Sequence, residues 1–263
     1  MKDTTQRSNS SAVADCPHAV DRGGSVRQAT TPRLMRVSEV DRCCAPTSTP
    51  VTVLKWLREF IARPHPQLGR AGSICPVVPH ALSIDSIWIT EITDEDPSVE
   101  SISAIITNYR NVFLETEPRS GPESKSKALL VTFPSLISRG ADGAALIDQV
   151  QYRLKPYFVE KGTMLGEFHA TNESPGLRNP AFRPLRSPVP MLAIRHMVES
   201  DLPFMTRATY TPKERSGFLR SYLFRLGGSL TQSSFNEALE CLIASEANLS
   251  TAGMREGGVP QRV

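Results

Sequence analysis

The sequence lacks the features of a membrane protein, a disulfide-rich secreted protein or a dedicated nucleic-acid-binding protein. No apolar run reaches the roughly 18–20 residues needed to cross a bilayer, and the N-terminus lacks the apolar core of a secretory signal. The 263 residues include only five Cys, an odd number, which argues against a disulfide framework and predicts a reduced, cytoplasmic protein. A net charge of +3 is too small for a dedicated nucleic-acid binder. We therefore expect neither a membrane nor a nucleic acid as partner.

The common catalytic and nucleotide-binding motifs are missing as well. The chain has no G-x-G-x-x-G after a strand, no G-x4-G-K-[ST], no G-x-S-x-G and no H-E-x-x-H. Nucleotide binding by the common folds is therefore not expected, and any site must be sought in other residues.

Length and composition predict one folded domain with a tail at each end. The chain is 40% hydrophobic and 22% charged, which is typical of a soluble globular protein. Residues 1–49 are rich in Ser, Thr, Arg, Pro and Asp and keep no helical or strand period, so they are predicted to be a disordered tail. We expect the single domain to span residues 50–248 and a short flexible tail to span residues 249–263.

Apolar periodicity within the domain predicts helices that alternate with strands. Helices are expected at residues 51–62, 97–116 and 144–161, strands at 86–92, 128–133, 164–169 and 190–198, and two terminal helices around 218–223 and 235–242. This order favours an α+β fold, a roughly four-stranded sheet with helices packed on it. A ferredoxin-like arrangement is one form of this class that fits.

One stretch, residues 162–204, lacks acidic side chains over most of its length. Between Ser174 and Val198 there is no Asp or Glu, whereas about two or three would be expected there from the average acid content of the chain. Proline is frequent in the same stretch and fixes the backbone, which reduces the entropy lost when side chains are organised. The stretch also holds four arginines, Arg178, Arg183, Arg186 and Arg195.

These four arginines are candidates for binding an anionic small molecule. A guanidinium group presents a planar fork of donors that matches a carboxylate or a phosphate. Arg195 is the strongest candidate, because it lies in an apolar predicted strand where an unpaired charge would be costly. The alternative is that the arginines pair with acidic residues elsewhere in the fold and hold a long loop to the sheet.

His169 and His196 are the candidate catalytic residues. They lie at the ends of adjacent predicted strands, so we expect them to converge on one site. A histidine there could act as general acid or base, or could ligate a metal or haem iron. Glu167 precedes His169 by two positions, which on a strand places both side chains on the same face. The alternative is that both histidines are hydrogen-bonded core or loop residues.

Cys75 is a candidate haem or thiolate ligand. It begins a Cys-Pro pair, and such pairs occur at thiolate–haem sites, so haem could be held by Cys75 or His169 with arginines on its propionates. Cys75 and His80 form a C-x4-H spacing, but without a C-x2-C or H-x3-H pair it does not predict a metal site. A nucleophilic Cys75 with His80 or His196 as base is a further alternative, and the cofactor remains open.

The motifs of the acid-poor stretch resemble a microbial family described as domain of unknown function 6875. The resemblance covers roughly residues 56–226 and is most specific at Asn179-Pro180, Phe182-Arg183-Pro184 and Ser187-Pro188-Val189-Pro190. Thr163 and Ala170 depart from the pattern, which has a Leu and a Pro there. The resemblance implies a shared fold and ligand but brings no activity. Such domains accompany small-molecule biosynthetic enzymes.

The sequence therefore predicts a small-molecule enzyme with an Arg-rich anion pocket, acting in specialised metabolism. The alternative is a non-catalytic ligand-binding or accessory module that uses the same pocket. In a third interpretation the acid-poor stretch is scaffold, and the ligand binds near Trp88 or Tyr109.

Overall fold

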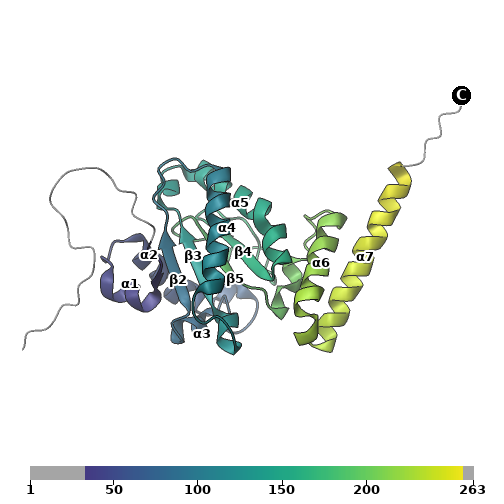
Figure 1. Cartoon of the computed structure of the whole chain (residues 1–263), viewed down its shortest axis with the longest axis horizontal. Helices are drawn as coiled ribbons and strands as arrows, with labels where there is room; N and C mark the ends of the chain where they lie inside the picture. The colour runs from purple at the N-terminus through teal and green to yellow at the C-terminus, as the bar shows by residue number, and fades with distance from the viewer. Residues whose placement is uncertain (1–32, 257–263) are drawn as a thin grey trace, which may run out of the picture. The chain divides into compact units, whose positions relative to one another are not determined.

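The structure, a computed structural model, describes residues 33–256 of the chain, with side chains through residue 249. Its centre is a five-stranded sheet in the order β1-β2-β3-β5-β4 (Figure 1). The strands are β1 (Met35–Arg36), β2 (Ile87–Glu91), β3 (Ala128–Thr132), β4 (Thr163–Phe168) and β5 (Met191–His196). β2 and β3 run parallel, and the other neighbouring pairs are antiparallel.

The predicted α+β class is confirmed, because helices pack on a mixed sheet that contains all four predicted strands. The fifth strand, β1, is two residues long and comes from the predicted tail. The strand order differs from the ferredoxin-like arrangement, in which another strand separates the parallel strands of a βαβ unit. Here β2 and β3 are direct neighbours.

Residues 33–49, which the sequence assigns to a disordered tail, are folded. β1 pairs with β2, and α1 (Val37–Cys43) follows it at once. Val37 and Val40 are buried in an apolar cluster with residues of β2. A two-residue strand and a seven-residue helix are too short to show a period in the sequence. The rest of this predicted tail, residues 1–32, lies outside the described residues.

Helices cover both faces of the sheet. α4 (Val99–Glu115) and α5 (Gly140–Glu160) pack on one face, where Ile106, Phe113 and Ile147 are fully buried (Figure 1). The other face meets α1, α2 (Thr49–Trp56) and α3 (Val78–Ser83). Side chains of β2 alternate between the two clusters, with Trp88 toward α4 and its neighbours toward α2, as the strand period requires.

The last two helices form a hairpin against α5 and β4. α6 (Pro212–Leu226) begins with a capping box, in which the Thr211 side chain accepts from the Glu214 N–H and Glu214 accepts in return. α7 (Gln232–Glu256) packs along α6 and runs past residue 249, where the sequence predicts a flexible tail; residues 257–263 lie outside the described part. None of the helices in the described part is long and apolar enough to cross a membrane.

Candidate functional site

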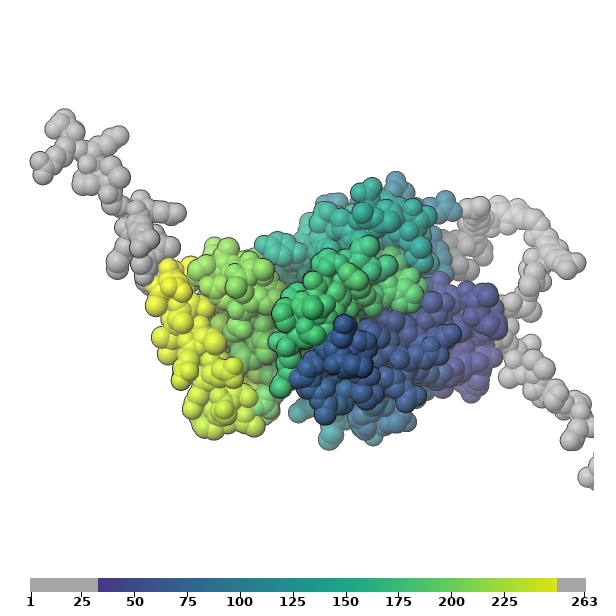
Figure 2. All heavy atoms as spheres, turned by 180° about the vertical axis from the view of Figure 1, so that it is seen from behind, coloured from purple at the N-terminus to yellow at the C-terminus, as the bar shows by residue number. Residues whose placement is uncertain are grey.

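The Arg/Pro loop, residues 170–190, joins β4 to β5 and lies against the loop of residues 63–75 (Figure 2, green against dark blue). Asn179 Nδ2 donates to the Gln67 carbonyl at 2.8 Å, and the Phe182 ring stacks on His65 with 4.6 Å between centroids. The Arg/Pro loop is therefore held to the domain by polar and aromatic contacts along its length.

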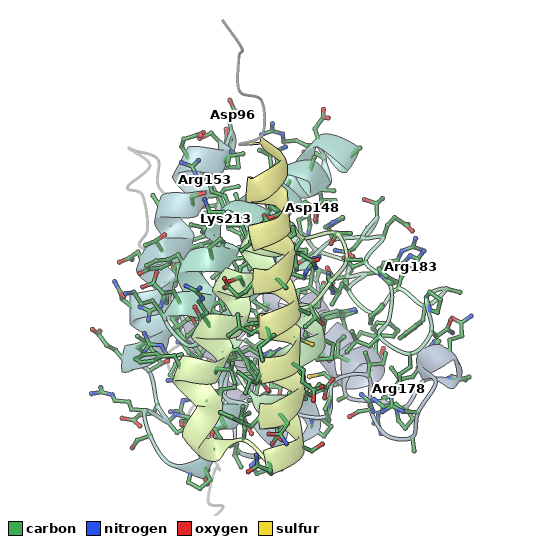
Figure 3. All side chains as sticks on the ribbon, turned by 90° about the vertical axis from the view of Figure 1, so that its right-hand side faces the viewer. Asp96, Asp148, Arg153, Arg178, Arg183 and Lys213 are labelled. Carbon is green, nitrogen blue, oxygen red and sulfur yellow. The ribbon has the colours of Figure 1, made fainter. Side chains whose placement is uncertain are left out.

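Arg183 and Arg186 both bind the carboxylate of Glu173. Arg183 Nε donates to Glu173 Oε2 at 2.8 Å, and Arg186 Nη2 donates to Oε1. Hydrogen bonds from the two guanidinium groups hold the pKa of Glu173 below its usual value. Arg178 is exposed, and Figure 3 shows it with Arg183 on the outer loops. The structure thus brings two of the four candidate arginines together around an acid of their own loop.

Arg195 lies elsewhere and has its own acidic partner. Its guanidinium group donates to Asp201 Oδ2 at 2.7 Å and to Oδ1 at 2.5 Å, and Asp201 is only 1% exposed. In the sheet Arg195 pairs with Met164 near the start of β4, whereas the Arg/Pro loop begins where β4 ends. The four arginines therefore do not line one pocket in this structure.

The two candidate histidines are also far apart, contrary to the expectation that they converge. β4 and β5 are antiparallel, so His196 at the end of β5 pairs with Thr163 at the start of β4. His169 follows the last residue of β4, which places it about 20 Å away, six strand residues at roughly 3.3 Å each. The carboxyl ends of two neighbouring strands meet only when the strands are parallel, so two histidines that each end a strand of this antiparallel pair lie at opposite edges of the sheet.

His196 is enclosed by apolar and cationic groups. Its ring lies 4.9 Å from that of Phe113, and its Nε2 is buried without a hydrogen-bond partner in the described part of the chain. Burial, with the charges of Lys127 and Arg110, lowers the pKa of His196 to about 4. It is therefore neutral near pH 7, and the charged groups that act on it, Lys127 and Arg110, are both cationic.

Cys75 lies in the loop before α3 and packs, partly buried, against the apolar cluster of α1, α2 and α3. Its N–H donates to the Ile61 carbonyl at 3.1 Å. Among the described residues no group of three or more His, Cys, Asp or Glu could hold a metal ion. Haem ligation by Cys75 or His169 stays a prediction.

A group of titratable side chains gathers instead between β4, α5 and the segment before α6. We call it the β4 cluster, and its members are Asp148, Lys155, Glu167, His169 and Tyr210. Leu165 of β4 packs beneath α5, and the strand period places Glu167 and His169 on the same side. The cluster therefore combines the edge strand of the sheet with the helix that covers it.

His169 is oriented by Asp148 of α5. The two side chains meet at 3.0 Å between Nε2 and Oδ1, and His169 Nδ1 lies 3.2 Å from the Thr171 hydroxyl. His169 is 3% exposed, whereas the Asp148 side chain is 52% exposed. Figure 3 shows Asp148 on the side of α5 toward the Arg/Pro loop, and Arg153 on the side toward α4. A carboxylate that fixes one imidazole nitrogen is a common arrangement for catalytic histidines.

Glu167 and Lys155 have pKa values moved toward neutrality from opposite directions. Burial raises the pKa of the Glu167 carboxyl. Lys155 is 4% exposed, and burial, with the charge of Arg207, lowers its pKa to about 8. Lys155 Nζ donates to the Phe204 carbonyl at 2.9 Å and also contacts the Tyr210 hydroxyl, whose pKa is raised by burial. Such pairs of perturbed groups are concentrated at functional sites.

Sequence reasoning found His169 and Glu167 but missed Asp148, Lys155 and Tyr210. A signal was present, because Asp148 and Lys155 are seven residues apart on the predicted helix and so share one face. An exposed lysine on a helix often has an acidic residue four positions away, and Lys155 has none. Tyr210 had no signal, since only the fold brings it to α5.

Two surface hollows lie away from the β4 cluster. One, of about 610 Å³, runs between α4 and α5 and includes Ser103 and Arg153; the other, of about 440 Å³, lies beside Phe224 of α6. Neither is lined by a member of the β4 cluster. We give more weight to the cluster, because the hollows contain no comparable set of buried titratable groups.

Comparison with known families gives one match. A family model described as "Domain of unknown function (DUF6875)" matches residues 51–236, a range that contains the whole β4 cluster and the Arg/Pro loop. Comparisons with curated proteins and with solved structures gave no match.

Proposed function

The chain belongs to the family described as Domain of unknown function (DUF6875), and we propose that it is a small-molecule enzyme that performs acid–base chemistry on an anionic substrate in the cytoplasm. The β4 cluster supplies the proton-transferring groups. Arg183 and Arg186 of the Arg/Pro loop bind the anion.

One observation carries this proposal, namely the grouping of a carboxyl, an amine and an imidazole on one side of an edge strand. Lys155 and His169 are almost completely buried, and each has a specific polar partner. Groups of opposite type whose environments bring their pKa values closer together can act as acid and base near pH 7.

The roles follow from the environment of each group. Glu167, whose pKa is raised by burial, is the proposed general base in its deprotonated form. Lys155, mostly protonated at that pH because its pKa is about 8, is the proposed acid, with Tyr210 as its hydrogen-bonded neighbour. His169, held by Asp148, positions or polarises the substrate beside them.

The proposed anion-binding arginines adjoin this cluster. Arg186 Nε donates to the Asn172 carbonyl at 3.2 Å, and Asn172 Nδ2 lies 3.4 Å from His169 Nε2. The backbones of His169 and Arg186 also form an isolated bridge. Only Asn172 therefore separates the Arg186 guanidinium group from the His169 imidazole. The positive charge of the guanidinium groups favours an anionic substrate over a neutral one.

The test is to incubate the purified chain with a small-molecule extract and to follow every compound by untargeted mass spectrometry. We expect at least one anionic compound to be converted, and the conversion to be lost in His169→Asn and strongly reduced in Asp148→Asn. Arg178→Ala is the matched control, because Arg178 is exposed and outside the cluster. Circular dichroism checks that each variant is folded.

Two outcomes would count against the proposal. If no compound is converted but one is retained by the protein, the non-catalytic binding module is the better account. If conversion survives in folded His169→Asn, the reaction takes place at another site.

A further inference from the structure

We infer that Glu173 occupies a carboxylate subsite, so that the substrate of the proposed enzyme is a carboxylic acid whose carboxylate replaces Glu173 between Arg183 and Arg186. This inference rests on the proposed function and names its substrate class.

The guanidinium groups are held in place without Glu173. Arg183 Nη1 donates to the carbonyls of Pro180 and Phe182, and Arg186 Nε donates to the carbonyl of Asn172. These acceptors belong to the backbone, so they remain when the Glu173 side chain turns away. The two forks would then face solvent already oriented for an incoming anion, which reduces the entropy lost on binding.

The backbone that supplies these acceptors is itself fixed. Trp56 Nε1 donates to the Arg186 carbonyl at 3.0 Å, and the Gly176 N–H donates to the Phe182 carbonyl at 2.9 Å. A further contact between the Arg/Pro loop and the loop of residues 63–75 holds the outer end, where the Gly69 backbone approaches Arg178. Because the loop is anchored at both ends, it can hold the two positively charged guanidinium groups close together despite their mutual repulsion.

Glu173 is the most exposed member of the group. Its side chain is 66% exposed, against 27% for Arg183 and 49% for Arg186. Ion pairs at the surface contribute little to stability, because water screens them, so the Glu173 carboxylate can be displaced at small cost. The Glu173 carboxylate neutralises only one of the two guanidinium charges. The rest of the Arg/Pro loop supplies no second acid, because the next acid along the chain is Glu199.

The carboxylate that occupies the site indicates the class of ligand that can replace it. A carboxylate has two coplanar oxygens, and Glu173 uses one for Arg183 and the other for Arg186. A substrate carboxylate can take both positions unchanged, whereas a tetrahedral phosphate would have to be accommodated differently. The site adjoins the β4 cluster, because Asn172 Nδ2 lies 3.4 Å from His169 Nε2.

The test is isothermal titration of succinate into wild type and Glu173→Gln, with inorganic phosphate as the comparison anion. If Glu173 fills its site about nine-tenths of the time, its removal raises the apparent affinity for succinate about tenfold. Adding Arg183→Gln or Arg186→Gln to Glu173→Gln should abolish that gain, and Arg178→Gln should not. Glu173→Ala replaces Glu173→Gln if the latter does not fold.

Three results would overturn the inference. The first is equal succinate affinity in wild type and Glu173→Gln, and the second is a gain in succinate affinity that persists when Arg183 or Arg186 is also replaced. The third is a preference for phosphate over succinate. Because binding is measured without turnover, the carboxylate subsite can fail while conversion in the extract experiment persists. Equally, succinate can bind as expected while no compound is converted, which would contradict the proposed function alone.

Discussion

Arg195→Ala is expected to lower the free energy of unfolding by about 3 kcal/mol, because it leaves the Asp201 carboxylate buried without its partner. Asp201 is 1% exposed and accepts from both ends of the Arg195 guanidinium group. It also accepts from the Val198 N–H at 2.8 Å, so the change disturbs the turn after β5. The expected loss is at the lower end of the range for buried pairs because the Arg195 side chain is 30% exposed.

Urea denaturation at pH 7 measures this loss. Arg178→Ala is the control, since an exposed arginine without such a partner should change stability by no more than about 0.5 kcal/mol. Arg195→Lys keeps the charge but not the fork and should fall between the two. If Arg195→Ala costs no more than the control, the pair with Asp201 is not structural, and Arg195 becomes available as the ligand-binding residue that the sequence predicts.

Glu167→Gln is expected to reduce turnover about 10²–10⁴-fold, the usual contribution of a positioned general base. Glutamine keeps the shape of the side chain, and with it the contact of the Ser174 hydroxyl with Glu167 Oε1 at 3.4 Å, but it cannot accept a proton. The measurement is the rate of conversion of the compound identified in the extract.

Glu115→Gln is the matched control for this change, because Glu115 is exposed at the end of α4 and is not a member of the β4 cluster. It should convert the compound at the wild-type rate. A loss of less than about tenfold in folded Glu167→Gln would show that Glu167 is not the base.

The sequence was most informative where a periodic pattern of apolar residues repeats several times. The α4 and α5 helices and strands β2 to β5 repeat apolar residues often enough to be recognised, and all of them are present. β1 and α1 were missed because they are short and depend on tertiary contacts. Val37 and Val40 of α1 are buried in a cluster with residues of β2, which is distant in the sequence. His169 and His196 were expected together because each ends a predicted strand, but β4 and β5 are antiparallel, so their carboxyl ends lie at opposite edges of the sheet.

The candidate site was predictable only in part. The acid-poor stretch drew attention to Arg183 and Arg186, but their partner Glu173 lies one residue before its acid-free part, which begins at Ser174. The arginines predict an anion pocket or pairing with acidic residues, and in the structure Arg183 and Arg186 both bind Glu173 of their own loop. Lys155 and Tyr210 are separated by 55 residues, so their contact arises from the packing of α5 against the segment before α6. Composition and spacing carry no trace of it.

The pH dependence of turnover tests the central claim, acid–base catalysis by the β4 cluster, most directly. Glu167 must be deprotonated to act as base, so the rate should fall as the pH drops through its raised pKa. Lys155 must be protonated to act as acid, so the rate should also fall as the pH rises through about 8. The account predicts a bell-shaped profile that loses its acidic limb in Glu167→Gln and its basic limb in Lys155→Met. A flat profile, or limbs that persist unchanged in both variants, would contradict it.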